Sequence, residues 1–179
     1  MYWMGHFATL ASIFAIFATL GVAYLWRSST LTHWQPIHLP NQLTLSTVML
    51  LCARASIEMA RYILRRRGFL QAYTSWLIRT AVFGTAFVVT QGLCWHSMLV
   101  QAVENNTNER FFFVLTGAHA VHILGGLIAL GYLLWRVWNP WEESVELRRN
   151  TITAMLAAYW HFMGVIWLLL YLLLFVKSV

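Results

Sequence analysis

The chain has 179 residues, of which 60% are hydrophobic and 10% are charged, and its mean hydropathy is +0.63. Soluble domains carry about a quarter charged residues, so this composition excludes an ordinary soluble domain and indicates an integral membrane protein. The net charge is +6 and the isoelectric point is about 9.8, but the arginines cluster beside apolar segments, which is typical of membrane topology and not of a nucleic-acid-binding face.

The first predicted helix covers about residues 7–26. Small side chains recur along it at helical spacing, from Ala8 to Thr19, and this stripe predicts a face that packs against another helix. The residues before it include no Lys or Arg, so we expect a retained span and not a cleaved signal peptide. A polar connection with Pro36 and Pro40 follows, because proline interrupts a helix.

The second predicted helix, about residues 43–64, is the most polar one. Arg54, Glu58 and Arg61 are spaced four and three residues apart and therefore share one face. Ionisable groups within a bilayer suggest a proton or ion path, or else a salt bridge that fixes the helix to its neighbours. Because no other predicted span supplies a further carboxylate, we favour the salt bridge, with Arg65 at the membrane surface.

The third predicted helix covers about residues 76–99 and carries Gln91 and Trp95 near its end. Cys52, in the second helix, and Cys94, in the third, both lie within apolar segments. A small apolar filler is the expected role of each, since a structural disulfide is not expected inside a membrane span. A polar loop follows, in which the triplet beginning at Asn105 matches a glycosylation acceptor, a pattern that arises often by chance.

The fourth predicted helix, about residues 112–135, combines small residues with two histidines. Gly117, Gly126 and the alanines between them would let another helix approach closely. His119 and His122 are three residues apart and lie on one face. A polar pair is unfavourable in lipid, so this face should turn toward protein, and the helix should be central in a bundle.

The fifth predicted helix covers about residues 152–176. Asn139 and Pro140 break the chain before it, and the charged segment 141–150 is predicted to form a short surface helix, with glutamates first and arginines last. The five spans account for almost all of residues 1–179, as expected for a single transmembrane domain. More arginines flank the even-numbered loops, so the N-terminus is predicted to be cytoplasmic and the C-terminus external.

The histidines and aromatic residues admit two interpretations each. His119, His122 and His161 could hold a metal or haem, since imidazole is the commonest metal ligand, or could form interhelical hydrogen bonds; we favour the hydrogen bonds. Trp160 and the aromatic residues around it could flank a lipid or quinone, or could serve as core and interface anchors. No nucleotide-binding, nucleophile or cysteine-rich metal motif occurs. The chain is therefore expected to be a subunit of a larger assembly.

Two motifs resemble subunit III of haem-copper terminal oxidases, the family of cytochrome c and quinol oxidase third subunits. One is the pattern Thr-Gly-x-His-x-x-His-x-x-x-Gly, and the other is Tyr-Trp-His-Phe followed by Trp-Leu. They are carried here by Thr116, Gly117, His119, His122 and Gly126, and by Tyr159, Trp160, His161, Phe162 and Trp167. The resemblance extends more loosely over the whole chain, as the five-helix bacterial form.

Three acidic residues of that family are absent from this chain. The resemblance places them at the positions of Ile13, Cys94 and Gly164. A role in proton uptake, or a lipid contact, that depends on these acids lacks their carboxylates here, and Glu58 is the residue that could compensate for them.

The resemblance implies an all-α, polytopic, non-catalytic subunit in the bacterial cytoplasmic membrane. It would bind neither haem nor copper, which are expected in partner subunits I and II, and it would hold phospholipid. The structural or lipid-binding residues would be His119, His122, His161, Trp160, Glu58, Arg54, Arg61 and Arg65. The alternatives are an accessory subunit of a nitric oxide reductase or another divergent respiratory complex and, in a different class, a small haem-binding membrane cytochrome.

Overall fold

The computed structural model describes residues 2–30, 40–66, 69–101, 107–138 and 145–176, and nearly all of these residues are helical. The helices of this part are α1 (Tyr2–Thr30), α2 (Asn41–Arg65), α3 (Leu70–Gln101), α4 (Thr107–Trp138) and α5 (Val145–Val176). All five of these described helices are long and apolar enough to cross a membrane. The prediction of an all-α, polytopic membrane protein is therefore confirmed.

Each helix extends beyond its predicted apolar segment. Helices α3, α4 and α5 have 32 residues each, or about 48 Å at 1.5 Å per residue, which exceeds the roughly 30 Å apolar core of a bilayer. Their ends therefore reach the polar interface while the backbone hydrogen bonds stay within the helix.

The segment between α4 and α5 differs from the prediction. Residues 145–150, expected to belong to a short surface helix, instead form the first turns of α5. Residues 139–144 and the triplet beginning at Asn105, which matches a glycosylation acceptor, lie outside the described residues.

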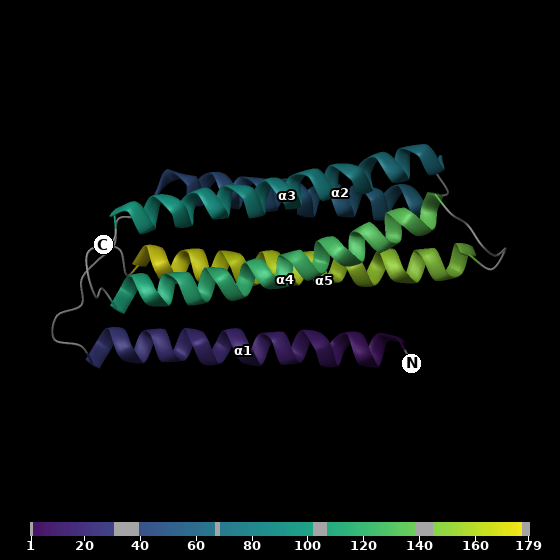
Figure 1. Ribbon diagram of the computed structural model, residues 1–179. Coiled ribbons are helices and arrows are strands. Elements are labelled where there is room, and N and C mark those ends of the chain that lie inside the picture. Colours follow the sequence, from purple (N-terminus) through teal and green to yellow (C-terminus); the bar gives the residue numbers. More distant parts are fainter. Residues whose placement is uncertain (1, 31–39, 67–68, 102–106, 139–144, 177–179) are drawn as a thin grey trace.

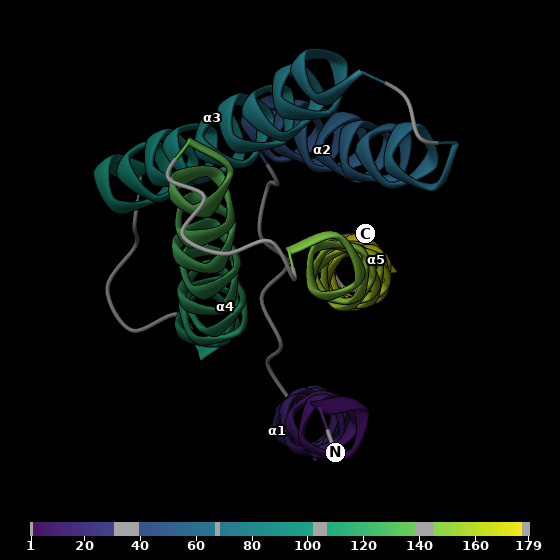
Figure 2. The same cartoon turned by 90° about the vertical axis from the view of Figure 1, so that its right-hand side faces the viewer.

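The helices lie side by side along one common direction, and consecutive helices run in opposite directions (Figure 1). Figure 2 shows α2 and α3 as one layer, α4 and α5 beside it, and α1 farthest from it. Among the described residues, α2 and α3 make the most extensive contact, whereas α1 contacts α4 and α5 only. Helix α4 thus contacts α1, α3 and α5, as expected for a central helix.

Helix α1 packs through a face other than the predicted one. Its buried side chains include Ile13, Phe17 and Tyr24, whereas the small-residue stripe is exposed. The stripe consists of Ala8, Ser12, Ala15 and Thr19. The larger side chains bury more apolar area against the bundle, and this decides which face of the helix turns inward.

Polar side chains form bridges between helices inside the bundle. Tyr24 on α1 donates to Oδ1 of Asn108 on α4 at 2.9 Å, and Trp95 on α3 donates to Oγ1 of Thr116 on α4 at 3.0 Å. These hydrogen bonds pair polar atoms that would otherwise have no partner in an apolar environment, and they fix the position of one helix along the next.

Candidate functional site

His119 lies fully buried at the meeting point of four helices. Its ring on α4 has centroid distances of 4.9 Å to Trp167 on α5, 5.7 Å to Phe87 on α3 and 6.0 Å to Phe17 on α1. Within the described part of the chain, neither ring nitrogen has a hydrogen-bond partner. His119 therefore acts as an aromatic packing element, and the expected interhelical hydrogen bond from its imidazole is not found there.

His122, one turn further along α4, also forms no interhelical hydrogen bond with its ring among the described residues. Its Nδ1 lies 2.7 Å from the carbonyl oxygen of Ala118 in the same helix, and its ring contacts Phe17 of α1 at 5.4 Å. The link to α5 comes from the backbone instead, because Tyr159 donates its hydroxyl proton to the carbonyl oxygen of His122 at 2.7 Å.

His161 lies in a different place, on the seam between α5 and α2. Its Nε2 is 3.1 Å from Oε2 of Glu58, and Nη1 of Arg61 is 3.3 Å from the same oxygen. The side chains of Arg61, His161 and Glu58 are 26%, 36% and 45% exposed. His161 therefore connects α5 with α2 through Glu58. The predicted salt bridge between Glu58 and Arg61 forms, but both residues belong to α2, so it does not link two helices.

Arg54 is not part of that ion pair, although it shares the face of Glu58. A Cβ at Gly164 of α5 would overlap Cδ of Arg54 and would lie 2.7 and 2.9 Å from its Nε and Nη1. The arginine stem thus packs directly on the glycine backbone. Among the described residues, no acceptor pairs with the guanidinium. Of the three residues considered for a salt bridge, only Glu58 and Arg61 form one in the described part of the chain.

The structure separates the three histidines that were considered as metal or haem ligands. His119 is enclosed by aromatic rings, His122 faces a carbonyl of its own helix, and His161 faces Glu58. Across the described ranges, no group of three or more His, Cys, Asp or Glu side chains lies close enough to hold a metal ion. The contacts of these histidines therefore support a role in holding helices together.

Trp160 of α5 fits between α3 and α4 because both helices present a glycine to it. A Cβ at Gly84 would lie 2.6 Å from Cη2 of Trp160, and one at Gly126 would lie 2.9 Å from Cε1 of Tyr159 and 3.7 Å from Trp160. A Cβ at Gly117, in contrast, would meet nothing within 4 Å. Close approach at Gly126 was predicted from the small-residue pattern, whereas Gly84 gave no such signal.

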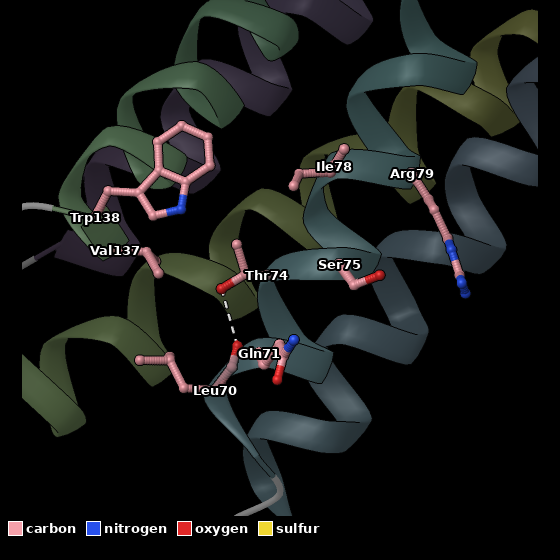
Figure 3. Close-up of a pocket in the computed structure, with 8 residues that line it drawn as sticks. All are labelled: Leu70, Gln71, Thr74, Ser75, Ile78, Arg79, Val137 and Trp138. Atoms are coloured by element: carbon pink, nitrogen blue, oxygen red, sulfur yellow. Dashed lines mark hydrogen bonds between the residues drawn. The ribbon is translucent and has the colours of Figure 1, made fainter.

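A groove of about 650 Å³ lies where α3 begins and α4 ends (Figure 3). It is lined by Leu70, Gln71, Thr74, Ser75, Ile78, Arg79, Val137 and Trp138. The guanidinium of Arg79 lies 4.3 Å from the ring centroid of Trp76, so its charge is held by a cation–π contact at the edge of the groove. The groove combines apolar walls with hydroxyl and amide groups, and the Arg79 side chain extends from its edge away from Val137 and Trp138 (Figure 3).

One interhelical hydrogen bond near His119 could not be foreseen. The indole nitrogen of Trp167 donates to Oγ1 of Thr47 on α2 at 2.9 Å. Trp167 belongs to a recognisable motif, but Thr47 is an ordinary threonine in an apolar stretch, and nothing in its local sequence points to a partner 120 residues away. His119 on α4 contacts side chains of α1, α3 and α5, and Trp167 extends this group to α2 through its bond to Thr47. The residues around His119 therefore connect all five described helices.

Comparison with known proteins gives a consistent result. The family described as Cytochrome c oxidase subunit III matches residues 1–179. A cytochrome c oxidase subunit 3 of Thermostichus vulcanus is 26% identical over 177 residues, which are 98% of this chain and 87% of the relative. One from Synechocystis is 28% identical over 165 residues, 90% of this chain and 69% of the relative. A probable cytochrome c oxidase subunit 3 of Nocardia farcinica is 25% identical, with coverage of 92% and 82%.

Proposed function

Because the chain belongs to the cytochrome c oxidase subunit III family, it is an accessory subunit of a haem-copper oxidase in the respiratory chain, and we propose that it stabilises the catalytic subunit I and holds phospholipid. The haem and copper of the complex then reside in partner subunits I and II. The whole complex reduces oxygen to water and couples this reaction to proton pumping.

Hydrogen bonds between polar side chains of different helices support a stabilising role. Trp167 bonds to Thr47, Tyr73 lies 2.7 Å from the Thr153 hydroxyl, and His161 bonds to Glu58. In each pair the two residues belong to different helices. Such hydrogen bonds restrict relative movement of the helices. A bundle held together in this way presents a rigid surface on which a larger subunit can pack.

The groove between α3 and α4 supports the proposed lipid binding. Arg79 is part of its lining, and Arg65 and Arg66 end α2 at the same end of the bundle. Basic side chains near a membrane surface attract anionic phosphate groups, and the apolar part of the groove, with Ile78 and Val137, suits an acyl chain.

The distribution of arginines supports a cytoplasmic N-terminus for a chain that we assign to a bacterial inner membrane. Arg65 and Arg66 at the end of α2, Arg136 in the last turn of α4 and Arg149 in the first turns of α5 lie at the end of the bundle where α1 begins (Figure 1). By the positive-inside rule, this end is cytoplasmic, and the C-terminus is external.

Proton delivery is a role that we assign to other subunits of the complex. At two of the positions where the family carries an acid, this chain has Ile13, which is 6% exposed, and Cys94, which is fully buried. At the third, Gly164 is covered by the stem of Arg54. None of these three positions supplies a carboxylate that could relay a proton, and the carboxylate of Glu58 is engaged by His161 and Arg61.

The experiment that tests this function is purification of a tagged copy of the chain in mild detergent, with mass spectrometry of the proteins and lipids and an absorption spectrum. We expect a large haem-containing subunit I, a subunit II and retained phospholipid. Recovery of the chain alone would overturn the proposed partnership. A Soret band from the chain alone would favour the haem-binding alternative.

A further inference from the structure

A group of ionisable side chains opens outward from the seam between α2 and α5. We call it the Arg54 cluster, and it consists of Arg54, Glu58, Arg61 and His161. The Glu58 side chain is 45% exposed and that of His161 is 36% exposed. Figure 2 shows α2 and α5 next to each other, with α4 on the other side of α5, so this seam borders the outside of the bundle.

The charges of the Arg54 cluster do not balance. The cluster contains two arginines and one glutamate, which leaves a charge of +1 when His161 is neutral. The single carboxylate is already engaged, since both Arg61 and His161 contact its Oε2. Arg54 pairs with no acceptor in the described part of the chain. The unmatched charge is therefore that of Arg54.

The position of Arg54 along α2 excludes the membrane surface as its environment. It lies thirteen residues after Asn41 and eleven before Arg65, which corresponds to about 20 and 16 Å along the helix axis. Lipid phosphates lie outside the roughly 30 Å apolar core. A guanidinium at the midpoint of the helix, with its stem packed on Gly164, is far from either layer of phosphates.

Exposed apolar side chains lie within about two helical turns of the Arg54 cluster residues on α2 and α5. Leu51 on α2 is 43% exposed, and Val165 and Leu168 on α5 are 48% and 40% exposed. A charge that faced only hydrocarbon at this depth would be strongly unfavourable. An apolar surface that carries one unmatched charge is, however, what a neighbouring transmembrane helix can cover if it carries the opposite charge.

We propose that the α2–α5 face docks a transmembrane helix of another subunit of the oxidase, and that this helix presents an Asp or Glu carboxylate to Arg54. This inference rests on the proposed function, because it requires the oxidase complex. A carboxylate is the chemical group that matches the planar fork of a guanidinium with two parallel hydrogen bonds. The Arg54 cluster thereby becomes neutral, and its charge fixes which face of the chain meets its partner.

The test compares Arg54→Met with Arg136→Gln in the complete, tagged oxidase. Methionine keeps an unbranched apolar stem over Gly164 but removes the charge, so the chain should reach the membrane in normal amounts. We expect the co-purified haem-containing subunit to fall about tenfold or more, because loss of one partner leaves a buried carboxylate uncompensated. Arg136, in the last turn of α4, provides the control, and its variant should retain the subunit.

A photo-crosslinking residue at Val165 identifies the occupant of the face. We expect an adduct with a transmembrane segment of an oxidase subunit that contains Asp or Glu, and we expect this adduct to disappear in Arg54→Met. The same probe at the exposed Ile128 of α4, which is 74% exposed, should not give this adduct.

Three outcomes would contradict the docking proposal. They are an adduct with lipid alone, an adduct with a segment that contains no carboxylate, and full retention of the haem-containing subunit by Arg54→Met. In each of these cases the proposed function stands as long as the wild-type chain still co-purifies with the oxidase. Failure of the wild-type chain to do so would instead overturn the proposed function itself.

Discussion

The imidazole Nε2 of His161 on α5 lies 3.1 Å from the carboxylate Oε2 of Glu58 on α2, although 103 residues separate them in the chain. His161 belongs to the motif by which the family is recognised, whereas Glu58 was singled out only because a carboxylate is unusual in a membrane span. Their contact gives both residues a common role, the connection of the two helices that form the α2–α5 face.

Replacement of His161 by Leu should lower the melting temperature of the purified complex. Interhelical hydrogen bonds in membranes contribute about 0.6 kcal/mol on average and at most about 1.7 kcal/mol, so a loss in this range is expected. A double-mutant cycle with Glu58→Leu measures it, because leucine has no oxygen that could accept a hydrogen bond from His161. The two losses should be less than additive, and strict additivity would show that the two side chains do not interact.

Gly126→Leu should impair assembly of the bundle. A Cβ at this position already lies 2.9 Å from the ring of Tyr159, and overpacking of a filled interior costs about 1–3 kcal/mol. Gly131→Leu on the same helix is the matched control, because a Cβ there meets nothing within 4 Å. The amount of folded chain in the membrane, measured by resistance to proteolysis, should fall for Gly126→Leu only. Equal resistance in the two variants would contradict the packing at Gly126.

Gly84→Ala should destabilise the chain, and Trp160→Phe should restore part of the loss. The added methyl carbon would lie 2.6 Å from Cη2 of Trp160 and 2.9 Å from Leu127. Phenylalanine lacks the outer ring that carries Cη2, so the combined variant should be more stable than Gly84→Ala alone. Thermal unfolding of the three variants provides the measurement, and absence of any rescue would place the clash elsewhere.

His119→Leu should leave the haem and copper content of the complex unchanged and should not lower its melting temperature. The ring is buried among aromatic side chains, and neither nitrogen has a hydrogen-bond partner in the described part of the chain. A buried polar group without a partner costs about 1–3 kcal/mol, so an apolar side chain of similar size removes a penalty. Stoichiometric loss of haem or copper would assign His119 a direct role at the metal centre. His161→Leu, which breaks an existing bond, should behave oppositely in the thermal assay.

The five apolar segments could be located from the sequence because a bilayer imposes a simple requirement on any chain that crosses it. Each span must be long, apolar and helical, and these properties belong to consecutive residues. The same reasoning placed the helix ends too far inward, since α4 continues to Trp138 and α5 begins at Val145. Hydropathy marks where lipid ends, whereas a helix ends where its backbone hydrogen bonds end.

The sequence alone established the membrane class, the helical spans, the close approach at Gly126 and the family resemblance, which all depend on composition, periodicity or short motifs. Tertiary structure decided which face of each helix turns inward. It buried Phe17 and exposed the small-residue stripe of α1, and it placed Arg54 against Gly164 and left His119 among aromatic rings. The physical reason is that burial and pairing depend on side chains from different helices, and helical periodicity alone does not specify the neighbour that each face will meet.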